Sequence, residues 1–251
     1  MTQRPTTERR PKAGSPVVVR RVVDLTDRNV DVYQPRSFPL FAAERRILRR
    51  LLRPGMRVLD LGCGDGRVAR QLPGWLGSVW ACDLKDEALR DLRRSPSAAR
   101  VHAFRGDARA QPLGSRTFDL VIFAYNGLDW LHPEEARLRA LREMERVVVP
   151  GGRVVFSSHN PVGELLSPRG LRSGAIWRAR GRFLPPRSPG YVGREGLMLH
   201  YASPADVIAQ VERHTDLRLE EALATRSGRR LPLPLLTAVS AWPTYVFRPP
   251  A

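Results

Sequence analysis

The sequence predicts an α/β protein in which helices cover both faces of a mostly parallel sheet. Short apolar runs of strand length, such as residues 58–61 and 118–124, alternate along the chain with segments whose apolar residues recur at helical spacing. These runs are apolar at nearly every position, as strands buried on both faces must be. The 251 residues are enough for one domain with a full hydrophobic core.

The first half of the predicted domain alternates strands and helices without interruption. Residues 38–52 read as a helix that a Pro-Gly pair ends, and the strand at residues 58–61 follows. Further predicted strands lie at 78–83, 101–104, 118–124 and 153–158, with helices at 66–73, 85–92 and from Pro133 onward, and a turn at 148–152. Residues 1–36 are rich in Pro, Thr and Arg, which predicts a flexible or extended N-terminal arm ahead of a domain at 37–251.

The second half is less regular. Residues 161–202 are predicted to form a substrate cap inserted after the fifth strand, because a long segment beside the carboxyl edge of a sheet is usually functional. Beyond the cap we expect a helix at 204–214 with Ser203 as its N-cap, strands at 197–201, 217–223 and 244–247, and an irregular connection at 231–236. An excess of arginines in the cap favours an acidic substrate: Arg169, Arg172, Arg178, Arg180, Arg182, Arg187 and Arg194.

Composition narrows the class of protein. No apolar run approaches the roughly 18 residues of a membrane span, and the N-terminus lacks the apolar core of a signal peptide, so we expect a cytoplasmic protein with no membrane contact. The two cysteines, Cys63 and Cys82, lie in or beside predicted buried strands and are expected to be reduced core residues.

The formal net charge of +17 suggests a polyanionic partner. Nearly all of the basic residues are arginines, however, and lysine occurs only at Lys12 and Lys85. Together with abundant Ala, Pro and Gly, this skew is typical of a GC-rich genome. The charge therefore supports nucleic-acid binding only where it clusters.

A glycine-rich loop follows the first predicted strand. Glycines 62, 64 and 66 separate that strand from a helical pattern, so backbone N–H groups and a helix N-terminus face a polar ligand. A nicotinamide-binding loop would space its glycines as G-x-G-x-x-G, but here Arg67 stands at the third glycine's place. Asp60, at the strand's end, would repel a pyrophosphate and attract an ammonium group. The loop therefore favours a cationic ligand over a dinucleotide.

Two further strands also end in acids. Asp83 closes the strand at 78–83, at a distance from the glycine loop where nucleoside-binding folds keep a carboxylate for the two ribose hydroxyls. Asp107 follows the strand at 101–104, after Gly106, which permits a close turn. Because parallel strands end at one edge of the sheet, the three acids predict one ligand site.

Residues 38–160 resemble the class I S-adenosylmethionine-dependent methyltransferases in the glycine loop, in the three acids, and in the order of helix, Val-Val-Pro-Gly-Gly turn and strand around residues 134–158. The resemblance implies a Rossmann-like seven-stranded sheet and S-adenosylmethionine as the cofactor, with no metal. It also implies that the cofactor is bound by Asp60, Gly62, Cys63, Gly64, Asp83, Leu84, Gly106, Asp107, Ala108, Ala124 and Tyr125.

Methyl transfer from a sulfonium is an in-line displacement, so positioning supplies much of the catalysis and a base is needed only where the acceptor must lose a proton. The candidate catalytic residues are His159, Tyr125 and Asp129, with His132, His200 and Tyr201 nearby. His159 is favoured because it follows a central strand and histidine titrates near neutrality.

The expected function is transfer of a methyl group to an O or N atom of a small-molecule acceptor, acidic or a natural product, by a monomer or homodimer. The Asn/Asp-Pro-Pro-Tyr/Phe motif of many nucleic-acid amino-methylating enzymes is missing after residue 124. Two alternatives stay open: an RNA methyltransferase that uses the basic arm and cap, and a non-catalytic module that binds S-adenosylmethionine.

Overall fold

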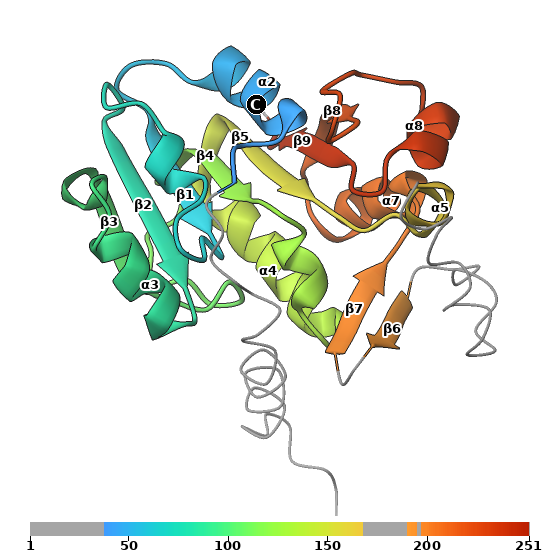
Figure 1. The fold of residues 1–251 in the computed structure, drawn as a ribbon, viewed down its shortest axis with the longest axis horizontal. Coiled ribbons are helices and arrows are strands. Elements are labelled where there is room, and N and C mark those ends of the chain that lie inside the picture. Colours follow the sequence, from blue (N-terminus) through green and yellow to red (C-terminus); the bar gives the residue numbers. More distant parts are fainter. Residues whose placement is uncertain (1–37, 168–189, 195–196, 251) are drawn as a thin grey trace, which may run out of the picture.

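The computed structural model describes residues 38–167, 190–194 and 197–250. Seven strands form one sheet in the order β3-β2-β1-β4-β5-β9-β8 (Figure 1). The strands are β1 (Arg57–Leu61), β2 (Ser78–Asp83), β3 (Val101–Arg105), β4 (Phe118–Phe123), β5 (Val148–Ser157), β8 (Arg218–Leu223) and β9 (Thr244–Arg248). The pairs from β3 to β5 are parallel, and β9 runs antiparallel to both β5 and β8. The predicted seven-stranded, mostly parallel sheet is confirmed.

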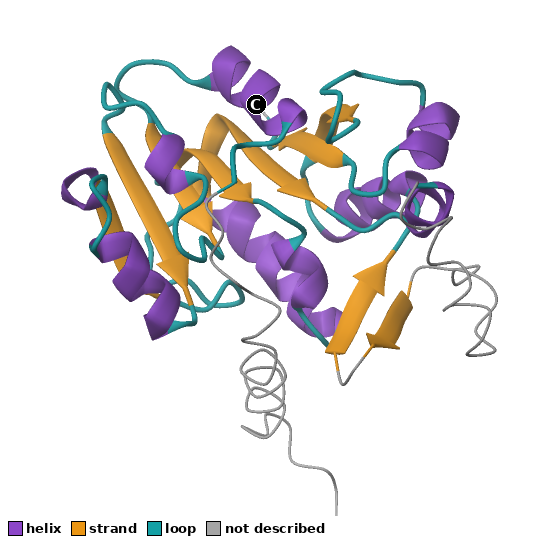
Figure 2. Cartoon of the chain, in the orientation of Figure 1, coloured by secondary structure: helices purple, strands orange, loops and turns teal. Residues whose placement is uncertain are grey.

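Helices cover both faces of the sheet (Figure 2). The helices are α2 (Ala42–Leu51), α3 (Asp86–Arg93), α4 (Glu134–Val147), α5 (Pro161–Leu166), α7 (Pro204–His214) and α8 (Leu233–Val239), with 3-10 turns η1 (Ala69–Gln71), η2 (Ala98–Arg100) and η3 (Gly127–Trp130). The core has two layers. Apolar residues of α2, α3 and η1 pack on one face, and those of α4, α7 and α8 pack on the other. Neighbours along a strand, such as Val58 and Leu59, point into opposite layers.

Two predicted elements of the core are wrong, and one predicted helix begins one residue later than expected. The helix expected at residues 66–73 is only the 3-10 turn η1, because the N–H of Ala69 is hydrogen-bonded to a carboxylate oxygen of Asp60 and Pro73 follows closely. The segment at 148–152 belongs to β5, where Val148 pairs with Phe118 ahead of an irregularity in the pairing. Pro133 is the residue before α4 and not its first residue.

In the C-terminal third, one segment differs from its predicted structure. The connection expected to be irregular at 231–236 contains α8, whose early proline lies where a helix needs no N–H donor. The helix α7 and its N-cap Ser203 are as expected. The predicted strand at 197–201 is β7 (Leu197–Tyr201), but it pairs with β6 (Gly190–Arg194) in a separate two-stranded sheet. The N-terminal arm and much of the predicted cap lie outside the described residues.

No helix in the described ranges has both the length and the apolar character that crossing a bilayer requires. The order of the sheet reverses between β1 and β4, since the chain leaves β1 toward β2 and returns from β3 to the other side. In an open α/β sheet, the loops diverge at such a point and leave a crevice at the carboxyl ends of the strands. The glycine loop after β1 and the segment after β4 border that crevice.

A buried ion pair joins α2 to the glycine loop. The guanidinium of Arg67 donates to both carboxylate oxygens of Glu44, over 2.9 and 2.6 Å, and both side chains are 8% exposed. The same carboxylate accepts the N–H of Phe41 at the start of α2, over 2.7 Å. The pair therefore fixes both the helix start and the end of the loop.

We expect Glu44→Gln to lower the free energy of unfolding by roughly 3–5 kcal/mol, because it removes the carboxylate charge that is paired with the buried Arg67 guanidinium. The double variant Glu44→Leu/Arg67→Met removes both charges and should be less destabilised than the single variant. Urea denaturation of the three proteins measures this. A single variant as stable as the parent would contradict the importance of the pair.

Candidate cofactor and acceptor site

The glycine loop adopts the backbone that its sequence requires. Gly62 and Gly64 have φ values of +60° and +55°, a region that favours glycine. A Cβ atom at Gly62 would lie 2.4 Å from the ring of Phe123, at the end of β4. The loop thus packs directly against the neighbouring central strand, while Gly62 itself is exposed.

Asp60 lies beneath this loop with 1% of its surface exposed. One carboxylate oxygen accepts the N–H of Ala69 over 2.9 Å. Burial raises the pKa of Asp60 to about 7, although that hydrogen bond and the charge of Arg67 lower it. A buried carboxylate in this state is stabilised by any cation that reaches it, which fits a ligand that carries an ammonium group.

Asp83 closes the loop from the side of β2. Its carboxylate oxygens accept the N–H of Gly64 over 2.8 Å and the N–H of Lys85 over 3.0 Å. Each oxygen keeps a second lone pair, and the side chain is only half-buried. The carboxylate is therefore fixed in place and can still accept two hydroxyl donors, as the ribose of a nucleoside offers. Leu84, beside it, is half-buried as well.

Asp107 is brought to the same edge, since the N–H of Gly106 donates to the carbonyl of Asp83 over 3.1 Å. Its carboxylate is occupied by Arg109, whose Nε lies 2.9 and 3.0 Å from the two oxygens. Burial would raise the pKa of Asp107, but the hydrogen bonds and charge of Arg109 hold it below its usual value. An adenine amino group would have to share this carboxylate with Arg109.

The two cysteines are joined by a backbone hydrogen bond, and their thiols are not reactive. Both are free and buried, as expected, and the N–H of Cys63 donates to the carbonyl of Cys82 over 2.9 Å. Burial raises the pKa of Cys82 to about 12 and that of Cys63 well above its ordinary value. Neither thiol is therefore a nucleophile at neutral pH. Among the described residues, no cluster of His, Cys, Asp and Glu could hold a metal ion.

An aromatic cluster, formed by Phe38, Phe41, Tyr125 and Trp242, borders the loop from the other side. Tyr125 follows Ala124 at the end of β4, has a φ of +54° and is 42% exposed. Its ring centroid lies 5.4 Å from that of Phe38 and 6.0 Å from those of Phe41 and Trp242. The guanidinium of Arg67 lies 5.1–5.8 Å from three of these rings.

His159 follows β5 and lies beside the aromatic cluster, with its ring centroid 6.3 Å from that of Trp242. Its Nδ1 lies 3.0 Å from a carboxylate oxygen of Asp129, and its Nε2 lies 3.2 Å from the amide nitrogen of Asn126. A carboxylate only accepts hydrogen bonds, so Nδ1 carries the proton and Nε2 is an acceptor. The imidazole is thus oriented with its basic nitrogen toward Asn126.

Asp129 connects several elements. It is fully buried and accepts hydrogen bonds from Arg137 of α4 over 2.6 Å and from Ser158 over 2.9 Å. His200 of β7 lies 3.5 Å from it. Burial would raise the pKa of Asp129, but its histidine neighbours and the charge of Arg137 hold it well below its usual range. Asp129, expected among the catalytic residues, lies behind His159, where its contacts orient the imidazole.

The structure thus brings Asp60, Asp83 and the glycine loop to one side of a site, and Tyr125 and His159 to the other. Sequence reasoning missed the partners that hold these residues. The signal for Arg67 was present, because it stands where a dinucleotide loop has glycine, but nothing pointed to Glu44 as its partner. Likewise no spacing indicated that Arg137 would be paired with Asp129.

Comparison with known proteins agrees with this geometry. The profile of a methyltransferase domain matches residues 58–152. The ubiquinone/menaquinone biosynthesis C-methyltransferase UbiE of Bordetella parapertussis is 35% identical over 125 residues, which are 48% of this chain and 47% of that protein. The protein of the same name from Laribacter hongkongensis is 33% identical over 126 residues, 47% of this chain and 48% of that one. The chain spans about half the length of the curated relatives it matches.

Solved structures share the fold over most of the chain. The CcbJ methyltransferase of Streptomyces caelestis matches with a TM-score of 0.63 and 22% identity, covering 89% of this chain and 96% of that one. The glycopeptide N-methyltransferase MtfA, in complex with S-adenosylmethionine, matches with a TM-score of 0.59 and 16% identity, covering 85% and 96%. Residues 58–152 therefore match a methyltransferase domain, and the described fold is shared with methyltransferases of known structure.

Proposed function

We propose that this protein transfers a methyl group from S-adenosylmethionine to an O or N atom of a small-molecule acceptor. The observation that carries the proposal is the pairing of two half-sites at the crevice. One half has buried or half-buried acids at the ends of β1, β2 and β3. The other has an aromatic cluster beside a histidine whose basic nitrogen is oriented by a buried carboxylate.

The residues present fit the cofactor. Asp60 would face its ammonium group, Asp83 would accept its ribose hydroxyls, and Asp107 would share its carboxylate with the adenine amino group. When bound, S-adenosylmethionine supplies a methyl group on a positively charged sulfur. The exposed backbone of Gly62, at a φ of +60°, allows the close approach that such a ligand needs.

His159 is suited to remove a proton from the acceptor. Its Nδ1–H is held by Asp129, which also stabilises the imidazolium that forms when Nε2 takes a proton. An acceptor hydroxyl or amine would replace the amide of Asn126 at Nε2 and lose its proton there. Asp129 acts through His159 and is a positioning residue, and Tyr125 contributes an exposed ring to the acceptor's surroundings.

The aromatic cluster indicates the kind of acceptor. Tyr125 is exposed and in ring contact with Phe38, Phe41 and Trp242, so a flat, largely apolar molecule would gain stacking contacts there. Small-molecule sites are mostly apolar with a few placed polar groups, and His159 is such a group. A natural product with a hydroxyl or amine fits this description.

A second candidate is transfer to carbon. The curated relatives are named C-methyltransferases of quinone biosynthesis, and they match this chain over the cofactor-binding half. A phenol-like acceptor that loses its proton to His159 could be methylated at either oxygen or ring carbon. Nuclear magnetic resonance of the methylated product distinguishes the two.

Titration calorimetry with S-adenosylmethionine and S-adenosylhomocysteine, followed by transfer of a labelled methyl group to a panel of aromatic alcohols and amines, tests the proposal. We expect both ligands to bind and Asp83→Ala to weaken binding at least tenfold, since it removes the acceptor for two hydroxyl donors. Failure of either ligand to bind would contradict the cofactor assignment. Tight binding without transfer to any acceptor class would favour a non-catalytic module.

We expect Asp60→Asn to raise the stability of the protein and to weaken S-adenosylmethionine binding. Because burial raises the pKa of Asp60 from 3.8 to about 7, its contribution to folding is full below about pH 4 and is lost as the pH rises through 7. The amide stays neutral at every pH. The free energy of unfolding of the variant should therefore rise relative to that of the parent as the pH goes from 4 to above 7, by at most roughly 4 kcal/mol. Unfolding free energies at several pH values measure it, and calorimetry should show weaker S-adenosylmethionine binding. A difference in stability that does not change with pH would contradict this.

His159→Asn should lower kcat by about 10²- to 10⁴-fold, the usual contribution of a general base, while changing the affinity for S-adenosylmethionine little. His102→Asn, at an exposed histidine of β3, is the matched control and should leave both unchanged. Asp129→Asn should also lower kcat, because the amide would favour the wrong tautomer of His159. If His159→Asn kept full activity and the same pH profile, the base would have to be another residue.

A further inference from the structure

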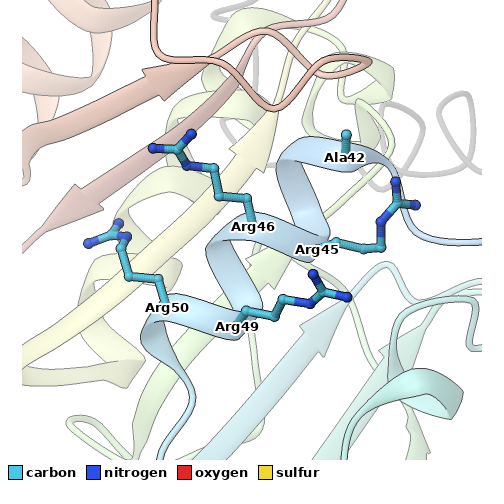
Figure 3. A pocket seen from close by; sticks show the side chains of 5 residues that line it. All are labelled: Ala42, Arg45, Arg46, Arg49 and Arg50. Carbon is cyan, nitrogen blue, oxygen red and sulfur yellow. The ribbon is translucent and has the colours of Figure 1, made fainter.

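The outer face of α2 carries a row of arginines that the proposed reaction does not use. Figure 3 shows Arg45, Arg46, Arg49 and Arg50 extending from this face in two pairs, Arg46 with Arg50 on one side and Arg45 with Arg49 on the other. Together with Ala42 they line a groove of about 490 Å³. All four side chains are exposed, and members of a pair are one helical turn apart.

A second group of arginines adjoins the first. The N–H of Ala43 donates to the carbonyl of Thr225 over 3.1 Å, and a Cβ atom at Gly228 would lie 2.9 Å from the carbonyl oxygen of Ala42. The loop after β8 is therefore packed on the start of α2. This loop also exposes three arginines: Arg226, Arg229 and Arg230. We call the arginines of α2 and of this loop the basic surface.

Neutralising carboxylates are scarce at this surface. Arg50 pairs with Glu220 and Glu221, and Glu220 is shared with Arg153. Glu44, the acid of α2 itself, points inward and is paired with Arg67. Within the described residues, the other arginines of the basic surface make no ion pair: Arg45, Arg46, Arg49, Arg226, Arg229 and Arg230. The basic surface thus has an uncompensated positive charge.

The residues that line the groove on α2 favour a nucleic-acid partner over a protein partner. A protein interface needs a buried apolar centre, commonly with aromatic anchors, but the groove offers only Ala42 between its guanidinium groups. Guanidinium groups match phosphate oxygens in two-bond geometry and release counter-ions on binding. We propose that the basic surface binds the sugar–phosphate backbone of an RNA strand. This inference is independent of the proposed function, because it concerns α2 and the β8–α8 loop and neither half of the crevice.

The test measures binding of a fluorescein-labelled, unstructured oligouridylate to the full-length protein by anisotropy over a series of salt concentrations. We expect dissociation constants of about 10⁻⁴–10⁻⁶ M at physiological salt, with log K falling linearly as log salt rises. Arg46→Glu/Arg49→Glu should weaken binding at least about tenfold at low salt and reduce the salt slope by about 1 or more. Arg46→Lys/Arg49→Lys keeps the charge, on which counter-ion release depends, and should retain most of the binding.

A matched control separates a local surface from the overall charge of the chain. Arg90→Glu/Arg94→Glu makes the same change in net charge at exposed arginines of and next to α3, on the β3 side of the sheet, away from α2 (Figure 1). This variant should bind RNA nearly as well as the parent. Equal loss in both reversed variants would overturn the proposal, because general attraction by a basic protein would explain it.

Two more results would overturn the proposal: no RNA binding by the parent protein, or binding of poly-glutamate but not RNA, which would indicate an acidic protein partner. Thermal unfolding and S-adenosylmethionine calorimetry of Arg46→Glu/Arg49→Glu should match the parent, since both side chains are exposed. These controls also keep the two proposals apart. Loss of RNA binding with intact cofactor binding concerns the basic surface alone, and failure of the parent to bind cofactor concerns the crevice alone.

Discussion

The central constraint on this structure is the parallel pairing of β1 with both β2 and β4. That pairing places the carboxyl ends of the three strands at one edge and makes the chain diverge on either side of β1. The glycine loop can pack against Phe123 only because β4 lies next to β1. Every group of the candidate site, from Asp60 to the residues after β5, is placed by this arrangement.

Buried charges then fix the loops that the sheet brings together. Arg67 and Glu44 join the glycine loop to the start of α2, and the aromatic cluster covers the pair. On the other side, Asp129 joins η3 to Arg137 of α4 and to His159 after β5. Charges this deeply buried are costly unless each is paired, so both sets restrict their loops to one arrangement. Such preorganisation suits a reaction that depends on positioning.

Two buried carboxylates of the site, Asp60 and Asp129, have opposite effects on the stability of the free protein. Asp60 is buried where its charge is unfavourable, and it lies beneath the glycine loop, where a cationic ligand would stabilise that charge. A residue of this kind costs stability in the free protein and recovers it when its counter-charge arrives. Asp129 is the converse, because its counter-charge is already in the fold as Arg137. Asp60 is thus suited to binding a cationic ligand, and Asp129 is suited to holding His159 in place.

The sequence by itself determined the alternation of strands and helices, the glycine loop and the acids at three strand ends, because these depend on local periodicity and on residue types at fixed spacing. It could not determine that β7 pairs with β6 in a second sheet, or that residues 233–239 form a helix, because both depend on contacts with distant segments. The pairings of Arg67 with Glu44 and of Arg137 with Asp129 were decided by the tertiary structure alone, since a charged residue carries no mark of its partner until packing removes it from water.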